Sequence, residues 1–522
     1  MGLRGCGWKG RTLASALVTA VCAAQPSIAA GEPAAGRLPV LEELRPQIDF
    51  WKRVFGEYSE LDVAIHDRED VARVYKVLRL GWMLAKTAPE QIPERRRAIV
   101  LEEIEKTRAT LLRLHRHRHE IDRLSPAERR IAALWAGDRN PRRFLEAADS
   151  KRIRAQSGLR ERFAEGVRIA QRYLPFMERV FLLEGIPLEI TRLPLVESGF
   201  NVEAYSRVGA AGLWQFMPAT GRQFLRIDDA VDERRDPFLS TIAAARFLKG
   251  NFEQLESWPV AITAYNHGRG GMLRAVDQLG TRDLTTIIER YDGRTFGFAS
   301  KNFYSELIAA IEVERDAERY FGRPPPEDPI RLDSFEMPAY VAFTDVVRAA
   351  QLPAERLAEL NLALRPAVLR GELYVPKGYQ LRLPDGAAPG FRKRFADLPR
   401  SALHRRQRAT FSWHRVRSGE TLSVIARRYG VSVARLKADN GLRNANHIRV
   451  GQRLKIHGSS GAVRRDGPTR SERFVTHSVR PGQTLSAIAR RYGTSVATLR
   501  RHNRIADPDH LRAGARLRVP VR

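Results

Sequence analysis

The stretch LVESGFN at residues 195–201 decides the fold assignment, and two segments downstream, GAAGLWQFMP at 209–218 and TAYNHG at 263–268, belong with it. Glu197 follows a mostly apolar run, residues 190–196, and comes shortly before a glycine turn. A carboxyl group at the end of a buried helix and beside a loop is desolvated, which raises its pKa. We therefore expect Glu197 to act as a general acid.

The two downstream segments carry groups that suit a sugar polymer. The run at 209–212 is rich in glycine and lets a polymer approach the backbone closely. Trp214 and Tyr265 can stack on sugar rings, while Gln215 and Asn266 can bond hydroxyl and acetamido groups. Taken singly, each aromatic is more simply a core residue. The combination at this spacing favours a glycan site.

A repeat occupies the C-terminal part of the chain. His414–Ile456 aligns without a gap onto His477–Val519, with 23 of 43 positions identical. Each copy predicts a strand, the opening Gly-x-Thr-Leu-Ser, a helix with a glycine cap, a second helix and a closing strand. This βααβ unit resembles the LysM module, which binds glycans containing N-acetylglucosamine. The resemblance implies glycan contacts from Gly419, Thr421, Leu422 and Asn440 in the first copy, and from Gly482, Thr484, Leu485 and Asn503 in the second.

A degenerate third copy lies upstream of these two. Asp345–Asn361 aligns onto Val424–Asn440, and Gly378, Leu381 and Leu383 repeat the spacing of the closing strand. The Gly-x-Thr-Leu-Ser opening is absent, so glycan binding there is in doubt. An unrelated α+β connector is an equal alternative.

The charge of the chain is unusual, whereas its composition is ordinary. Its 522 residues exceed one hydrophobic core, and two to four domains are expected. The net charge is +29, and residues 412–522 carry 24 Lys and Arg against 6 Asp and Glu. This basic tail predicts a polyanionic partner, which could be nucleic acid, acidic lipid or acidic cell-wall polymer.

The N-terminus favours the cell wall among these partners. Basic residues precede an apolar run at 13–24 and the small residues SIAA at 27–30, which is the pattern of a secretory signal. The run is too short to span a bilayer, and an uncleaved anchor is the alternative. Cys6 and Cys22 both lie inside the signal, so disulfides and Cys-ligated metal sites are not expected in the mature chain. Export disfavours nucleic acid.

Residues 41–178 show almost continuous helical periodicity, and the apolar stripes are expected to be core faces. They comprise Ile48, Trp51, Phe55 and Tyr58, then Val71, Val74, Val77 and Leu78. His115, His117 and His119 alternate with arginines in one such helix. A solvated basic face is favoured over a metal site, because no Cys or His-Glu-x-x-His pattern is adjacent.

The segments around Glu197 resemble the family 1 lytic transglycosylases, and the repeats point to the group with C-terminal LysM modules. The resemblance covers residues 181–322 and both repeats. It implies a mainly α fold with a lysozyme-like helical catalytic domain, followed by α+β LysM modules. The expected segments are a signal peptide (1–30), an N-terminal helical region (31–178), the catalytic domain (179–322), the degenerate module (330–385), a linker (386–411), the first LysM module (412–457), a linker (458–474) and the second LysM module (475–520).

The resemblance also assigns roles. Glu197 is the catalytic acid, and Ser206 lies near the substrate N-acetyl group. Gln215 and Met217 shape the glycan cleft. Tyr265 and Asn266 match the Ala-Tyr-Asn motif, with Tyr265 near the catalytic carboxyl. Ser198, Ser300 and Tyr304 complete the expected substrate contacts.

One departure concerns the Glu-Thr-x-x-Tyr motif of many relatives. Ser300 occupies the position of its Glu, while Tyr304 fits. The second acidic contact is therefore in doubt, and Glu306 lies one turn away if the register differs.

A single site-like carboxyl suffices when the substrate supplies the nucleophile. Asp232, Glu233 and Asp236 are expected to hold helices together, and Glu203 lies in a polar turn. The expected reaction cleaves the bond between N-acetylmuramic acid and N-acetylglucosamine and forms a 1,6-anhydro ring, without metal or cofactor. A lysozyme-type hydrolase and a non-catalytic glycan-binding scaffold are the alternatives. The expected partners are peptidoglycan strands and the anionic envelope of a bacterium. The protein is expected to be exported to the periplasm or cell envelope and to associate with peptidoglycan.

Overall fold

The computed structural model describes most of the chain between residues 38 and 521. The described residues are 38–117, 124–323, 325–408, 411–457 without 443, 446 and 447, then 473–479, 514–521 and single positions between them. The expected signal with both cysteines, His119, Gly482 and Thr484 lie outside these residues. The chain divides into two units, Met1–Arg408 and Ala409–Arg522. Along the described chain, no helix combines the length and apolarity needed to cross a membrane.

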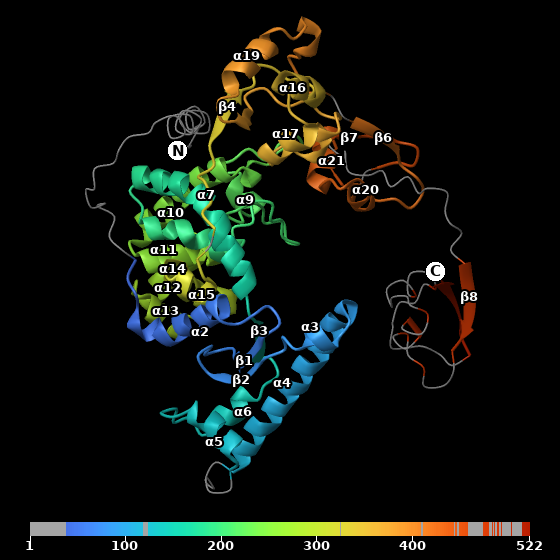
Figure 1. Ribbon diagram of the computed structural model, residues 1–522. Helices are drawn as coiled ribbons and strands as arrows, with labels where there is room; N and C mark the ends of the chain where they lie inside the picture. Colours follow the sequence, from blue (N-terminus) through green and yellow to red (C-terminus); the bar gives the residue numbers. More distant parts are fainter. Residues whose placement is uncertain are drawn as a thin grey trace, which may run out of the picture. The chain divides into compact units, whose positions relative to one another are not determined.

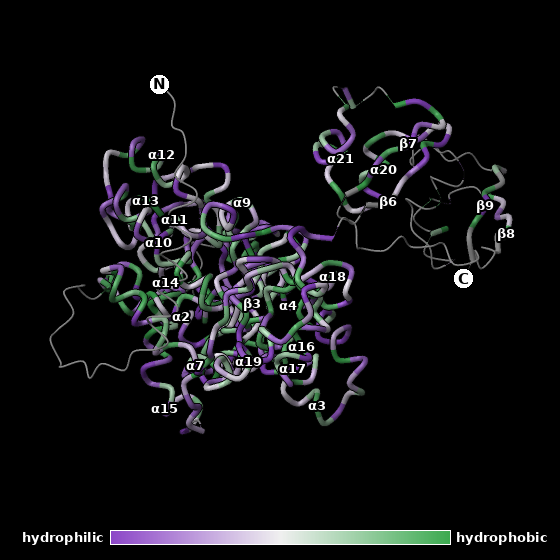
Figure 2. Tube along the Cα trace, turned by 90° about the horizontal axis from the view of Figure 1, so that it is seen from above, coloured by the Kyte–Doolittle hydropathy of each residue, from purple (hydrophilic) through white to green (hydrophobic). Residues whose placement is uncertain are grey.

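A helical domain makes up most of the first unit (Figure 1). Hydrophobic and hydrophilic stretches alternate along its helices (Figure 2). The helices are α2 (Arg45–Gly56), α7 (Arg160–Glu184), α8 (Leu193–Glu197), α9 (Pro218–Gly221), α10 (Pro237–Leu255), α11 (Trp258–His267), α12 (Arg269–Leu279), α13 (Leu284–Arg290), α14 (Phe298–Arg315) and α15 (Ala317–Phe321). Helix α2 packs along α14 and α7, and its Ile48 and Trp51 belong to the same core. The expected boundary at residue 178 is therefore wrong, because it falls inside α7.

A three-stranded antiparallel sheet lies between α2 and α7 in the sequence. Strand β1 (Val63–Asp67) is central, with β2 (Val74–Leu78) on one side and β3 (Ile153–Ser157) on the other. The helical expectation for this segment is wrong. Val74 and Val77 mimic a helix by their spacing, yet β-branched residues favour strands. Helices α3 (Met83–Lys86), α4 (Ile92–Arg116), α5 (Pro126–Ala133) and α6 (Arg143–Ala147) complete this region.

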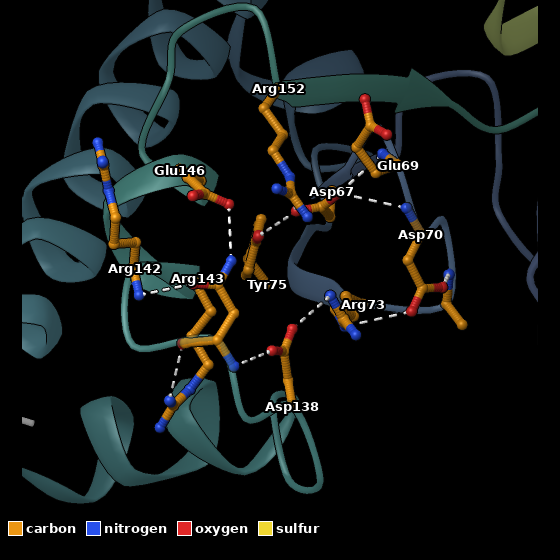
Figure 3. Close-up of polar contacts among 12 residues, drawn as sticks. Asp67, Glu69, Asp70, Arg73, Tyr75, Asp138, Arg142, Arg143, Glu146 and Arg152 are labelled. Atoms are coloured by element: carbon orange, nitrogen blue, oxygen red, sulfur yellow. Dashed lines mark hydrogen bonds and ion pairs between the residues drawn. The ribbon is translucent and has the colours of Figure 1, made fainter. Parts of the chain in front are cut away.

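A buried carboxylate ties the turns of this sheet together (Figure 3). Asp67, at the end of β1, is fully buried and accepts from the Tyr75 hydroxyl at 3.0 Å and from Arg152 Nε at 2.8 Å. The guanidinium groups of Arg73 and Arg152 both lie over the ring of Trp135. A buried charge with this many partners is a structural group.

A small module with two strands and three short helices between them follows the helical domain. Strands β4 (Leu332–Glu336) and β5 (Gln380–Pro384) pair antiparallel around α16 (Phe343–Ala350), α17 (Ala354–Leu360) and α18 (Pro366–Leu369). Helix α19 (Ala388–Ala396) packs on α16 and β4 through Phe391 and Phe395. The linker expected at 386–411 is therefore wrong at α19, because two phenylalanines four residues apart give the helix a core face.

The second unit contains the two repeats. In the first, β6 (Phe411–Arg415) and β7 (Arg453–His457) pair around α20 (Leu422–Tyr429) and α21 (Val433–Asp439). In the second, β8 (Arg473–Ser478) pairs with β9 (Arg516–Val521). The expected βααβ order is confirmed for the first repeat.

Candidate active site

Glu197 is the last residue of α8, a five-residue helix whose Leu193, Pro194 and Leu195 are buried. The chain then turns sharply, because Gly199 and Phe200 adopt φ of 62° and 57°. The Phe200 side chain is fully buried and anchors this turn. The turn leaves Glu197 half-buried at the helix end, as the sequence predicts.

A second carboxyl group, that of Glu306 on α14, interacts with Glu197. Helix α14 packs against α8, and Glu306 is also half-buried. Burial, and to a smaller extent the charge of Glu306, together raise the pKa of Glu197 to about 8. Burial likewise raises the pKa of Glu306 to about 8. Both groups therefore hold a proton at neutral pH.

The loop at 204–217 is fastened to the carboxyl site through its backbone carbonyl groups. The Ser198 hydroxyl, next to the acid, donates to Leu213 O at 2.8 Å. The Tyr265 hydroxyl donates to Trp214 O at 2.7 Å. Burial and the charge of Glu197 raise the pKa of Tyr265 well above its usual value, which places this phenol near the carboxyl. Two hydrogen bonds thus tie the loop to the surroundings of Glu197.

Inside the loop, the predicted contact residues brace the backbone. Ser206 accepts from Ala210 N at 2.9 Å through its hydroxyl. Gln215 has φ of 46° and donates from Nε2 to Gly212 O at 2.8 Å. Met217 is 44% exposed, so its thioether is available to a ligand.

Two residues of the motifs face the core. Trp214 is fully buried, donates to Thr241 Oγ1 and stacks on Phe181 with ring centroids 5.7 Å apart. The expectation that Trp214 stacks on sugar is wrong, since no face of its ring is free. Ser198 is also buried, and its hydroxyl is used by Leu213 O and Pro194 O.

Ser300 and Tyr304, in the segment that departs from the family motif, lie in different surroundings. Ser300 donates to Asn266 Oδ1 at 2.9 Å, and Asn266 is exposed. Tyr304 is buried and donates to Pro39 O at 2.6 Å, so it anchors the start of the described chain. The acidic group whose charge acts on Glu197 is that of Glu306.

Sequence reasoning missed two exposed apolar side chains of the loop. Tyr205 is 59% and Val208 76% exposed. Exposed apolar groups beside a carboxyl site suit the apolar faces of sugar rings. Their signal in the sequence was an aromatic and an aliphatic residue in a loop that otherwise favours small residues.

The acidic residues Asp232 and Asp236 make structural contacts. Asp232 is buried and paired with Arg234 at 2.7 Å. Asp236 caps α10 by accepting from Phe238 N and Leu239 N. Within the residues that the structure describes, no group of three or more His, Cys, Asp or Glu side chains could hold a metal ion.

Three segments of the chain match known domain families. Residues 184–288 match the transglycosylase SLT domain, and residues 414–457 and 477–520 each match the LysM domain. The chain is an SLT-domain transglycosylase with two LysM domains. The expected family and the mainly helical, lysozyme-like fold class are thereby confirmed.

Two relatives cover different parts of this transglycosylase. It is 29% identical over 360 residues to membrane-bound lytic murein transglycosylase D of Escherichia coli (strain K12), which covers 68% of this chain and 77% of the relative. It is 43% identical over 95 residues to N-acetylmuramoyl-L-alanine amidase sle1 of Staphylococcus haemolyticus, which covers 18% and 28%.

In the LysM domains, the predicted glycan-binding residues have structural partners. Gly419 has φ of 79°, and Thr421 caps α20 by accepting from Val424 N. Leu422 and Leu485 are buried in the two cores. These residues shape the turn and core on which a glycan surface would rest.

One asparagine joins helix to strand in each LysM domain. Asn440 Nδ2 donates to Leu436 O at 2.8 Å and Lys455 O at 2.7 Å, while its Oδ1 accepts from Lys455 N. Asn503 makes the same three bonds in the second domain. Both amides are therefore occupied within the fold.

Proposed function

We propose that this transglycosylase cleaves the β-1,4 bond between N-acetylmuramic acid and N-acetylglucosamine in peptidoglycan and leaves 1,6-anhydromuramoyl ends. The observation that carries the proposal is the half-buried carboxyl group of Glu197, whose pKa near 8 keeps it protonated at neutral pH. A general acid works best when its pKa lies near the working pH. The LysM domains bring the enzyme to the cell wall.

In this mechanism Glu197 first donates its proton to the glycosidic oxygen as the bond to the muramoyl C1 breaks. The 2-acetamido group of the substrate stabilises the cationic centre. Glu197, now a carboxylate, takes the proton of the muramoyl 6-hydroxyl as that oxygen bonds to C1. The proton returns to Glu197, and water is not consumed.

Glu306 raises the alternative of a hydrolase with two carboxyl groups. A nucleophile or general base must be ionised, whereas burial raises the pKa of Glu306 to about 8. Glu306 is thus protonated at neutral pH and is not available there as an ionised nucleophile or general base. This supports the transglycosylase reaction over hydrolysis.

The proposed compartment is the periplasm, reached by the secretory signal at residues 1–30. The basic C-terminal part and the LysM domains support a location at the peptidoglycan.

The proposal is tested by digesting purified sacculi and identifying the products by mass spectrometry. The wild type should release anhydromuramoyl ends, and Glu197→Gln should lose at least about 1,000-fold in rate. Glu203→Gln is the matched control, because Glu203 is an exposed carboxylate six positions along the chain. Hydrated reducing ends from the wild type would establish a hydrolase, and full activity of Glu197→Gln would exclude this acid.

A further inference from the structure

The degenerate module is joined to the SLT domain by its backbone. Asp232 N donates to Ala363 O at 2.8 Å, and Arg365 N donates to Ala230 O at 2.9 Å. Val231 is fully buried in the hydrophobic core of the module. A loop of the catalytic domain is therefore part of the module.

The same loop carries Arg234, which holds the glycan-cleft loop. Its side chain is 1% exposed, and Nε and Nη2 donate to both carboxylate oxygens of Asp232. Nη1 donates to Gly209 O at 2.6 Å and to Phe216 O at 2.8 Å. These two carbonyl groups lie at the two ends of the segment 209–216. The guanidinium group of Arg234 therefore links both ends of this segment.

A close approach of the backbone supports this arrangement. Gly212 has φ of 76°, and a Cβ built there would lie 1.8 Å from Arg234 O. A larger residue at 212 would thus force the two segments apart. The loop and the chain around Arg234 pack as one body.

Two arginines of the module reach the acidic residues on either side of Arg234. Arg365 Nη2 lies 3.3 Å from Asp232 Oδ2, the group that orients Arg234. Arg382, itself buried, lies 3.2 Å from Asp236, which caps α10. Buried carboxylates need such partners.

The module has the same asparagine hydrogen bonds as the two LysM domains, but it also contacts the catalytic domain. Asn361 Nδ2 donates to Leu357 O and Arg382 O, and Oδ1 accepts from Arg382 N. These are the bonds that Asn440 and Asn503 make in the LysM domains. The side chain of Arg382, in contrast, is directed to the catalytic domain.

We propose that residues 332–384 are a LysM-fold module that supports the glycan-cleft loop, with Arg234 and Arg365 as positioning residues for the transglycosylase reaction. The loop 204–217 is held between Glu197 and the module. Loss of an arginine loosens it, and the glycan binds less well at an otherwise intact acid.

The test compares Arg234→Lys and Arg365→Gln with Arg356→Gln in the full chain. Arg356 is an exposed residue of the same module that pairs with Glu359, three positions along its own helix. Kinetics use soluble uncrosslinked glycan strands, and pull-down on intact sacculi reports the LysM domains. Hydrogen–deuterium exchange follows the backbone of 204–217.

We expect Arg365→Gln to raise KM about tenfold with kcat within about twofold, and Arg234→Lys to lower kcat/KM about 100-fold. Exchange in 204–217 should rise in both, with sacculus binding unchanged, and Arg356→Gln should match the wild type. Wild-type KM and exchange in a folded Arg365→Gln protein would overturn the proposal. So would a loss of sacculus binding with normal kinetics, which would make the module a glycan binder. The inference rests on the proposed function only through the kinetic assay. An inactive wild type would contradict the proposed function. The hydrogen–deuterium exchange of 204–217 would then decide whether the module supports the loop.

Discussion

Glu197 and Glu306 influence each other's protons, and this coupling has a measurable consequence. We expect Glu306→Gln to move the alkaline limb of the kcat/KM profile to lower pH. The charge of Glu306 helps to raise the pKa of Glu197, so its removal lets the acid ionise earlier. Glu314→Gln, on the same helix and paired with Arg192, is the control. An unchanged limb would show that Glu306 does not act on the acid.

Glu306 also lowers the free energy of unfolding at a pH above the pKa that it has in the unfolded chain. A carboxyl whose pKa is raised on folding is ionised in the unfolded chain between pH 4.5 and 8 but neutral in the native one, so native stability falls as pH rises through that window. Glu306→Gln should therefore unfold at a higher temperature than the wild type, with a gap that grows from pH 5 to pH 8. A gap of about 1–3 kcal/mol at pH 8 is expected. A gap that shrinks with pH would contradict the raised pKa.

At this scale the sequence predicted the acid and missed its surroundings. Glu197 was identifiable because its helix end and glycine turn are local features. Whether Trp214 faces substrate or core depends on Phe181 and Thr241, which are distant in the chain. Glu306 was available only as an alternative register, since its meeting with Glu197 depends on how α14 packs against α8.

Among the elements, the asparagine that joins helix to strand is a test of the LysM fold. We expect Asn440→Ala to destabilise the first LysM domain by about 2 kcal/mol or more, because three hydrogen bonds are lost in a small core. Thermal unfolding and sacculus pull-down measure the effect. Arg435→Ala, which removes an exposed ion pair with Asp439, should change little. Equal losses in both variants would deny Asn440 a special role.

Element type was predictable where the pattern and the propensity agree. The βααβ order of the first repeat follows from its glycine caps and short apolar runs. The sheet at 63–78 was missed because Val74 and Val77 match a helical period as well as a strand. Helix α19 was missed because its glycine, proline and arginine residues read as a linker, although Phe391 and Phe395 give it a core face.

For the whole molecule, the concentration of positive charge predicts salt-dependent attachment. Residues 412–522 hold most of the net charge of +29, and peptidoglycan is acidic. Binding to sacculi should weaken steadily as ionic strength rises and screens the charges. Neutral chitin oligosaccharides serve as the control ligand, since they offer N-acetylglucosamine without charge. Binding to sacculi that does not change with ionic strength would show that the positive charge does not attach the protein to peptidoglycan.

The joining of the SLT domain to the degenerate module sets where the protein can be divided. A fragment that ends at residue 322 would expose Val231 and leave Asp232 without Arg365. A minimal enzyme for crystallisation or inhibitor screening therefore extends through α19, to about residue 404, where His404 pairs with Tyr340. The smallest fragment expected to fold as an active enzyme is therefore larger than the SLT domain alone.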